Sequence, residues 1–144
     1  RYDFKRNRVV FLVKDGNKVV DAVGRSIDGR SPKWYRYGDS KKPFVVGDSN
    51  KAIVVEDCAS ACSISNKITG VALLGTSLLQ DYIPSLLHYQ KIYVALDKDA
   101  TDKAIDMVKT LCRLVPTKLM VLPRDLKNMT KDERDDFLRN RIDR

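Results

Sequence analysis

The chain has 144 residues, of which 43% are hydrophobic and 32% are charged, so it can form one domain with a packed core and is not disordered in bulk. No apolar run approaches the roughly 18 residues of a membrane-spanning helix, no signal peptide is present, and a first residue of Arg suggests a fragment of a longer chain. Lys and Arg exceed Asp and Glu by 27 to 19, and residues 1–51 hold +7 of the formal net charge of +8.

The first part of the chain predicts β-structure. Residues 9–13 and 19–20 are apolar runs separated by Asp15-Gly16, a strong hairpin signal. Residues 25–50 are rich in Gly, Pro, Ser and charge, with aromatic side chains among the basic ones, and predict loops and short strands rather than a helix. We therefore expect residues 1–51 to form a small, basic, β-rich subdomain.

From residue 52 onward, apolar runs alternate with helical patterns. The expected strands are 53–55, 71–74, 92–96 and 119–122. Helical spacing is expected between them, over 58–68, 78–87 and 104–112, and a capping box at Thr130 opens a terminal helix within 130–144. Strands without polar alternation, separated by helices, predict an α/β fold with a parallel sheet flanked by helices over 52–129.

Acidic residues follow three of these strands. Glu56 and Asp57 come after the first strand, Asp97 and Asp99 after the third, and Asp125 shortly after the fourth. Because ligands of an open α/β sheet bind outside the carboxyl ends of its strands, these clusters should meet at one edge. Any single one of them has an alternative role as an N-cap of the following helix.

The available side chains narrow the chemistry. The chain has one histidine, His88, and three cysteines without a CxxC pair, so a zinc site or a disulfide framework is not expected. The expected compartment is reducing and cytoplasmic. Converging carboxylates without softer ligands favour Mg²⁺ or Mn²⁺. Asp97 and Asp99 would lie on one side if the chain stays extended there. These residues predict a site for metal-assisted phosphoryl transfer.

Residues 53–129 resemble a TOPRIM domain, the metal-binding module of bacterial-type primases, topoisomerases of types IA and II, and certain nucleases. Glu56 matches the glutamate after the first strand, and residues 97–99 match the DxD motif. Residues 74–77, LGTS, and 122–128, LPRDLKN, resemble segments of primases. The resemblance implies that Glu56, Asp97 and Asp99 are catalytic metal ligands and that Asp125 is a further ligand.

The stretch upstream makes the resemblance more specific. Residues 24–35 are similar to the "GR…PKY" stretch that precedes the TOPRIM domain in primases. That stretch belongs to a basic subdomain which guides template and nucleotide. By this resemblance Arg25, Arg30 and Lys33 contact phosphates and Trp34 contacts the nucleic acid, although an aromatic side chain here more commonly covers the junction between subdomains.

The sequence also departs from the family pattern. Asp57 stands where the family usually has Gly, residues 100–102 replace an Ala-Gly step, and Asn128 replaces an Asp. None of these changes removes the four acidic residues of the expected site. The departures suggest a divergent branch, such as a phage or plasmid primase.

The resemblance implies synthesis of short RNA primers by a nucleotidyltransferase. Its expected partners are single-stranded DNA template, ribonucleoside triphosphates and a replicative helicase, with no membrane, in the cytoplasm of a bacterial or phage-infected cell. Two alternatives remain at this stage. One is a TOPRIM-type nuclease that uses the same acids with water as nucleophile, and the other is a non-catalytic module that binds single-stranded nucleic acid.

Overall fold

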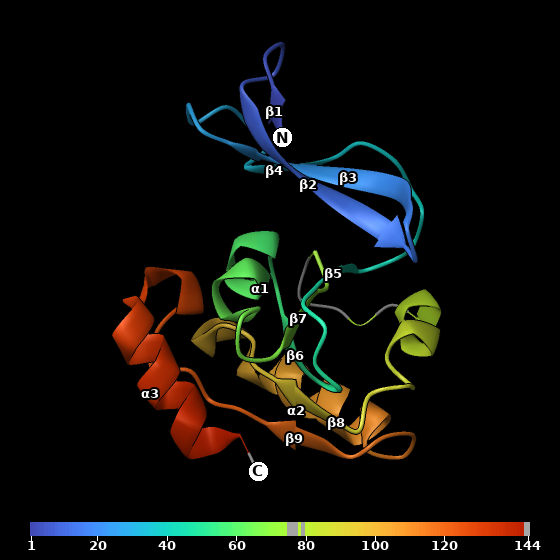
Figure 1. Ribbon diagram of the computed structural model, residues 1–144, viewed down its shortest axis with the longest axis vertical. Coiled ribbons are helices and arrows are strands. Elements are labelled where there is room, and N and C mark those ends of the chain that lie inside the picture. The colour runs from blue at the N-terminus through green and yellow to red at the C-terminus, as the bar shows by residue number, and fades with distance from the viewer. Residues whose placement is uncertain (75–77, 79, 143–144) are drawn as a thin grey trace.

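Two β-sheets, one above the other, organise the molecule (Figure 1). The computed structural model describes residues 1–74, 78 and 80–142. The N-terminal sheet is antiparallel, in the order β1-β2-β3-β4. Its strands are β1 Tyr2–Asp3, β2 Arg8–Asp15, β3 Lys18–Ser26 and β4 Trp34–Arg36. The expected hairpin is confirmed: β2 and β3 pair across a turn in which Gly16 has a φ of 63°, a conformation that glycine adopts without strain.

The second sheet has five strands in the order β5-β7-β6-β8-β9. They are β5 Phe44–Val46, β6 Lys51–Val55, β7 Thr69–Ala72, β8 Lys91–Val94 and β9 Thr117–Leu119. The four strands from β6 to β9 are parallel, as expected, and β5 adds an antiparallel edge that the sequence did not predict. The α/β class is therefore confirmed, with a mixed sheet in place of a purely parallel one.

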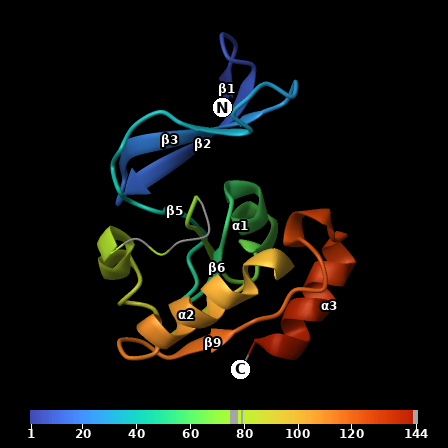
Figure 2. The same cartoon turned by 180° about the vertical axis from the view of Figure 1, so that it is seen from behind.

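Helices cover both faces of the five-stranded sheet (Figures 1 and 2). They are α1 Cys58–Ile64, α2 Thr101–Leu111 and α3 Lys131–Arg141, with the 3₁₀ turns η1 Gln80–Ser85, η2 Lys98–Ala100 and η3 Leu126–Asn128. Alternate residues of β6 face opposite cores: Ile53 and Val55 pack with α1 and α3, and Ala52 and Val54 pack with η1 and α2. All four are buried, which explains the unbroken apolar run.

Three parallel strands end earlier than expected. Apolar runs extend to residues 74, 96 and 122, whereas β7, β8 and β9 end at residues 72, 94 and 119. The side chains just beyond the strand ends, such as Leu73 and Leu96, are still buried under the helices, so the apolar run in the sequence extends beyond the end of the strand. Of the helix expected over 78–87, residue 79 lies outside the described residues, and residues 80–85 form the short 3₁₀ turn η1 with Pro84 inside it. The capping box of α3 at Thr130 is confirmed.

One core runs across the junction between the two sheets. Val13 and Val23 of the N-terminal sheet belong to the same buried cluster as Phe44 and Ile53 of the five-stranded sheet. Phe11 packs edge to face against Phe44, with ring centres 5.8 Å apart. The N-terminal sheet therefore lies directly on the α/β part, above the carboxyl ends of its strands (Figure 1). Among the described residues, no helix is long and apolar enough to cross a membrane.

Candidate metal centre and cavity

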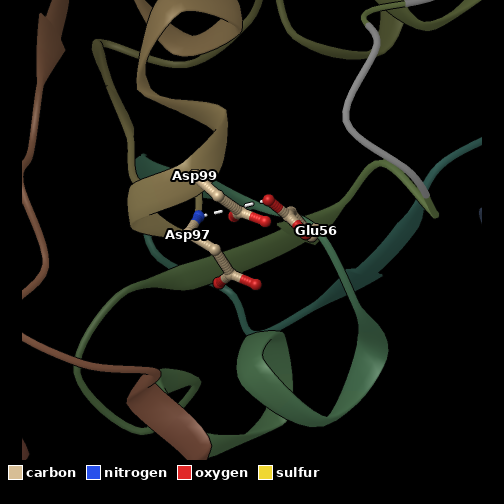
Figure 3. Close-up of side chains that lie close together, drawn as sticks. All are labelled: Glu56, Asp97 and Asp99. Carbon is tan, nitrogen blue, oxygen red and sulfur yellow. Dashed lines mark hydrogen bonds between the residues drawn. The ribbon is translucent and has the colours of Figure 1, made fainter.

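Three carboxylates gather at the carboxyl edge of the five-stranded sheet (Figure 3). Glu56 follows the last residue of β6, and Asp97 and Asp99 flank the start of η2, after β8. Each of the three offers an oxygen within 4.8 Å of the oxygens of the other two. The structure thus brings together the three residues for which the sequence predicted catalytic metal ligation.

The backbone at the aspartate pair differs from the expectation. The chain does not stay extended after β8 but turns into η2, with Asp97 as the N-cap and Asp99 within the turn. The Asp97 amide donates a hydrogen bond of 3.1 Å to Oε1 of Glu56, which holds this turn to the end of β6 (Figure 3). Asp97 and Asp99 were expected to lie on one side of an extended chain. The tight turn of η2 instead brings their carboxylates together with that of Glu56.

Asp97 has an unusual environment for a carboxylate. Burial raises its pKa from 3.8 to about 7, and a hydrogen bond with Asp125 and the charge of Glu56 act in the same direction. Asp125, the N-cap of η3, thus lies against Asp97, where the sequence predicted a fourth acidic group. A cation in this site would offset the repulsion between carboxylates that helps to raise the pKa of Asp97.

The residues present fit a hard divalent cation. The donors are carboxylate oxygens from separate segments, which suit Mg²⁺ or Mn²⁺ rather than a metal that prefers sulfur or imidazole. Within the described chain, Glu56, Asp97 and Asp99 form the group of acidic, histidine or cysteine side chains that is close enough to hold such an ion.

We expect the metal-free protein to lose stability as the pH rises from 5 to 8. The pKa of Asp97 is about 7 in the folded protein, and the reference value of 3.8 applies to the unfolded chain. Between these two pH values the folded protein therefore retains a proton that the unfolded chain has released. That contribution is complete below about pH 4 and disappears as the pH rises through 7. Urea unfolding in the presence of a chelator measures it. Asp97→Asn should flatten this part of the profile, and an unchanged profile in the variant would contradict the assignment.

A cavity of about 380 Å³ opens beside the acidic cluster, between the two sheets. Glu56, Asp97 and Asp125 line it from the α/β part, and Lys33 and Trp34 line it from the N-terminal sheet. Trp34 also packs near Phe11, with ring centres 5.9 Å apart, so it covers the junction and faces the cavity at once. Two of the residues proposed for nucleic-acid binding therefore face the predicted metal ligands.

Arg36 also lines this cavity, and the sequence analysis missed it. It follows Trp34 by two positions on β4 and so projects to the same face of the strand. Its guanidinium donates to Asp21 at 2.7 Å and to the Tyr82 hydroxyl at 3.1 Å, joining the N-terminal sheet to η1. Residues 25–50 predicted loops and short strands without bounds for any strand, so the alternation of side chains along β4 could not identify Arg36 from the sequence.

Lys127 is a second missed cation of the cavity. Its ammonium group donates to Oδ2 of Asp57 at 2.7 Å, while Oδ1 of Asp57 accepts from the Ser60 amide and caps α1. Asp57 thus has the capping role considered as its alternative, and it also fixes η3 to the start of α1. The departure from the family pattern at this position supplies an ion pair to the cavity wall.

The other two basic residues do not line this cavity. Arg25 lies beside Trp34, with its guanidinium carbon 5.4 Å from the ring centre. Arg30 lines a separate cavity and pairs with Asp28 at 2.7 Å. Of the LGTS segment, residues 75–77 lie outside the described residues, so the likeness to primases there stays an expectation.

The comparisons with known proteins identify the fold. No protein-family profile matches the sequence, and no curated protein does. The structure of the DnaG primase catalytic domain bound to ssDNA superposes with a TM-score of 0.75 at 20% identity, over 92% of this chain and 51% of that one. A DNA primase domain from Pseudomonas aeruginosa gives 0.76 at 21%, over 94% and 50%.

The E. coli primase catalytic core gives a TM-score of 0.75 at 21% identity, over 93% of this chain and 51% of that chain. This chain therefore spans about half the length of the primase structures that it matches. The resemblance to primases expected from the sequence is confirmed at the level of the fold: the chain has the fold of the DnaG catalytic core over nearly its whole length.

Proposed function

We propose that this chain is the catalytic part of a DNA primase, a nucleotidyltransferase that makes short RNA primers on single-stranded DNA. The observation that supports it best is the composition of the cavity. Carboxylates that fit a metal lie on one wall, and Lys33, Trp34 and Arg36 lie on the opposite wall. A polymerising site must hold both a metal-bound triphosphate and a template strand, and this cavity offers groups for each.

The proposed roles follow from position and charge. Glu56, Asp97 and Asp99 would hold Mg²⁺ or Mn²⁺, with Asp125 as a further ligand. The ion would supply neutralisation of charge on the transferred phosphoryl group. Glu56 also orients the Asp97 backbone, as its hydrogen bond shows.

The cationic wall of the cavity has a matching role. Lys33 would attract the phosphates of ribonucleoside triphosphates, and Trp34, with Arg25 against its ring, would stack on a template base. Arg36 is held by its protein partners and so shapes the wall.

We propose that residues 1–51 form the basic subdomain, residues 52–129 the TOPRIM domain and residues 130–144 a terminal helix. Strand β5 lies within residues 1–51 but pairs into the sheet of the second domain. A replicative helicase is the proposed protein partner. Because the proposed reaction uses replicating DNA, the cytoplasm of a bacterial or phage-infected cell is the proposed location.

Primer synthesis is tested directly with labelled ribonucleotides. The chain is incubated with Mn²⁺ or Mg²⁺, a single-stranded template and radiolabelled ribonucleoside triphosphates, and the products are resolved by length. We expect oligoribonucleotides that require both template and metal. Cleavage of the template without synthesis would instead favour the TOPRIM-type nuclease. Binding of the strand without metal binding or chemistry would favour the non-catalytic module.

A further inference from the structure

The carboxylates at the edge of the five-stranded sheet fall into two sets. Glu56, Asp97 and Asp99 form the cluster described above, with oxygens within 4.8 Å of one another (Figure 3). Asp57 and Asp125 line the same cavity as Glu56 and Asp97 but do not belong to that cluster. In the described part of the chain, no other three acidic, histidine or cysteine side chains approach one another so closely. The edge therefore offers one set of donors for an ion, with two further carboxylates beside it.

A lysine is paired with one member of the second set. The Lys127 ammonium donates to Oδ2 of Asp57 at 2.7 Å, and both side chains line the cavity. The two side chains are 26% and 16% exposed, so this pair is less screened by solvent than a salt bridge on the open surface. The other oxygen of Asp57 accepts from the Ser60 amide at 2.8 Å. Both oxygens of Asp57 are therefore already used by the protein, and one of them is used by a cation.

The turn that carries Lys127 is fixed in place. Leu126, which is 1% exposed, anchors η3 in the hydrophobic core. The Arg134 guanidinium of α3 donates to the backbone carbonyls of Leu126 and Met129, on either side of the end of the turn. Asp125, the proposed further metal ligand, is the N-cap of the same turn. The ammonium is thus held against the start of α1 by the segment that also presents Asp125.

The position of this ammonium bears on how many divalent ions the edge can hold. Phosphoryl transfer commonly uses two ions about 3.5–4 Å apart, which stabilise the attacking and the leaving oxygen. A second ion would need carboxylate oxygens beyond the cluster, and Asp57 and Asp125 are the further carboxylates that line this cavity. The Lys127 ammonium already binds Asp57 and would repel an ion placed beside it. A positive side chain therefore stands where a second ion would find its donors.

We propose that the Lys127 ammonium takes the place of a second divalent ion, so that the protein binds a single Mg²⁺ or Mn²⁺ at Glu56, Asp97 and Asp99. In the proposed reaction the ammonium, rather than a second ion, neutralises phosphate charge on this side of the cavity. Asp57 and Lys127 act as a unit, because the carboxylate fixes the ammonium and the ammonium keeps that carboxylate from a metal. This role of Lys127 rests on the proposed metal-dependent function, whereas the ion pair itself does not.

The number of Mn²⁺ ions bound per chain tests this role without any measurement of activity. Mn²⁺ is titrated into the chain, and the ion left free is measured by electron paramagnetic resonance. We expect one bound ion in the parent and two in Lys127→Ala, which frees Asp57 and removes the repelling charge. Two ions in the parent, or one in Lys127→Ala, would overturn the role of Lys127 and leave the metal centre standing. No binding in the parent would overturn both this role and the proposed metal centre.

Two matched variants separate the charge of Lys127 from the loss of an ion pair. Asp57→Asn breaks the same pair but keeps the ammonium, so it should still bind one ion. Lys118→Ala removes an exposed lysine of β9 that does not line this cavity, and it should also bind one ion. A second ion in Asp57→Asn as well as in Lys127→Ala would mean that a loosened η3 opens the edge, and would overturn the role of the charge. Circular dichroism checks each fold, and Lys127→Met, which keeps the length of the side chain, replaces Lys127→Ala if that variant does not fold.

Discussion

Replacing Asp97 and Asp99 together by Asn is expected to abolish divalent-metal binding and the proposed primer synthesis while leaving the fold intact. Both residues belong to the cluster with Glu56, in which the oxygens lie within 4.8 Å of one another. Removing two of three anionic donors should weaken Mn²⁺ binding by more than about 100-fold, since affinity for hard cations depends on ligand charge. Electron paramagnetic resonance of free Mn²⁺ measures the binding, and circular dichroism checks the fold.

A control with the same change of charge makes that result specific. Asp106→Asn/Asp136→Asn alters two exposed carboxylates on α2 and α3, outside the cluster, and should leave Mn²⁺ binding unchanged. Asp97→Asn/Asp99→Asn should also unfold at a higher temperature than the parent in the presence of a chelator, because the repulsion around Asp97 is relieved. Parental Mn²⁺ affinity in this double variant would show that the metal centre lies elsewhere.

The fold was largely predictable because its main signals are local. Buried parallel strands give apolar runs, and a helix that begins at Thr130 has a capping box that can be read from four residues. The antiparallel β5 gave no such signal: it has three residues, follows Pro43 and is fixed by pairing with β7 and by Phe44 in the core. Its place depends on tertiary contacts that are distant in sequence.

The acidic part of the site was predictable for a topological reason, and the basic part only in fragments. Carboxylates after parallel strands must share one edge, so Glu56 and Asp97 could be paired across 41 positions. Which basic residues face that edge depends on the alternation within β4 and on how the N-terminal sheet packs. For this reason Lys33, expected to contact phosphates, lines the cavity beside the acidic cluster, whereas Arg30 lines another cavity, and the sequence analysis missed Arg36.

Arg36 also joins the two halves of the cavity. Asp21 is the buried partner of its guanidinium: the Asp21 side chain is 0% exposed and accepts from Arg36, from the Ala22 amide and from Ser40. Burial alone would raise the pKa of Asp21, but these hydrogen bonds outweigh it and hold that pKa below its ordinary value. On the other side, Arg36 donates to Tyr82 of η1. The network therefore ties the cationic wall to the α/β part.

Asp21→Ala is therefore expected to lower the free energy of unfolding by about 2 kcal/mol, because the partly buried Arg36 guanidinium loses its charge-assisted hydrogen bond to the carboxylate. Asp39→Ala, which removes an exposed carboxylate from the loop after β4, should change it by less than about 0.5 kcal/mol. Tyr82→Phe removes only the hydroxyl that links η1 to Arg36, at about 1 kcal/mol. Urea unfolding measures all three.

Because Glu56 and Asp97 lie on the other wall, Asp21→Ala and Tyr82→Phe should retain Mn²⁺ binding while weakening template binding. Equal losses of both would mean that the network supports the whole fold rather than the cationic wall.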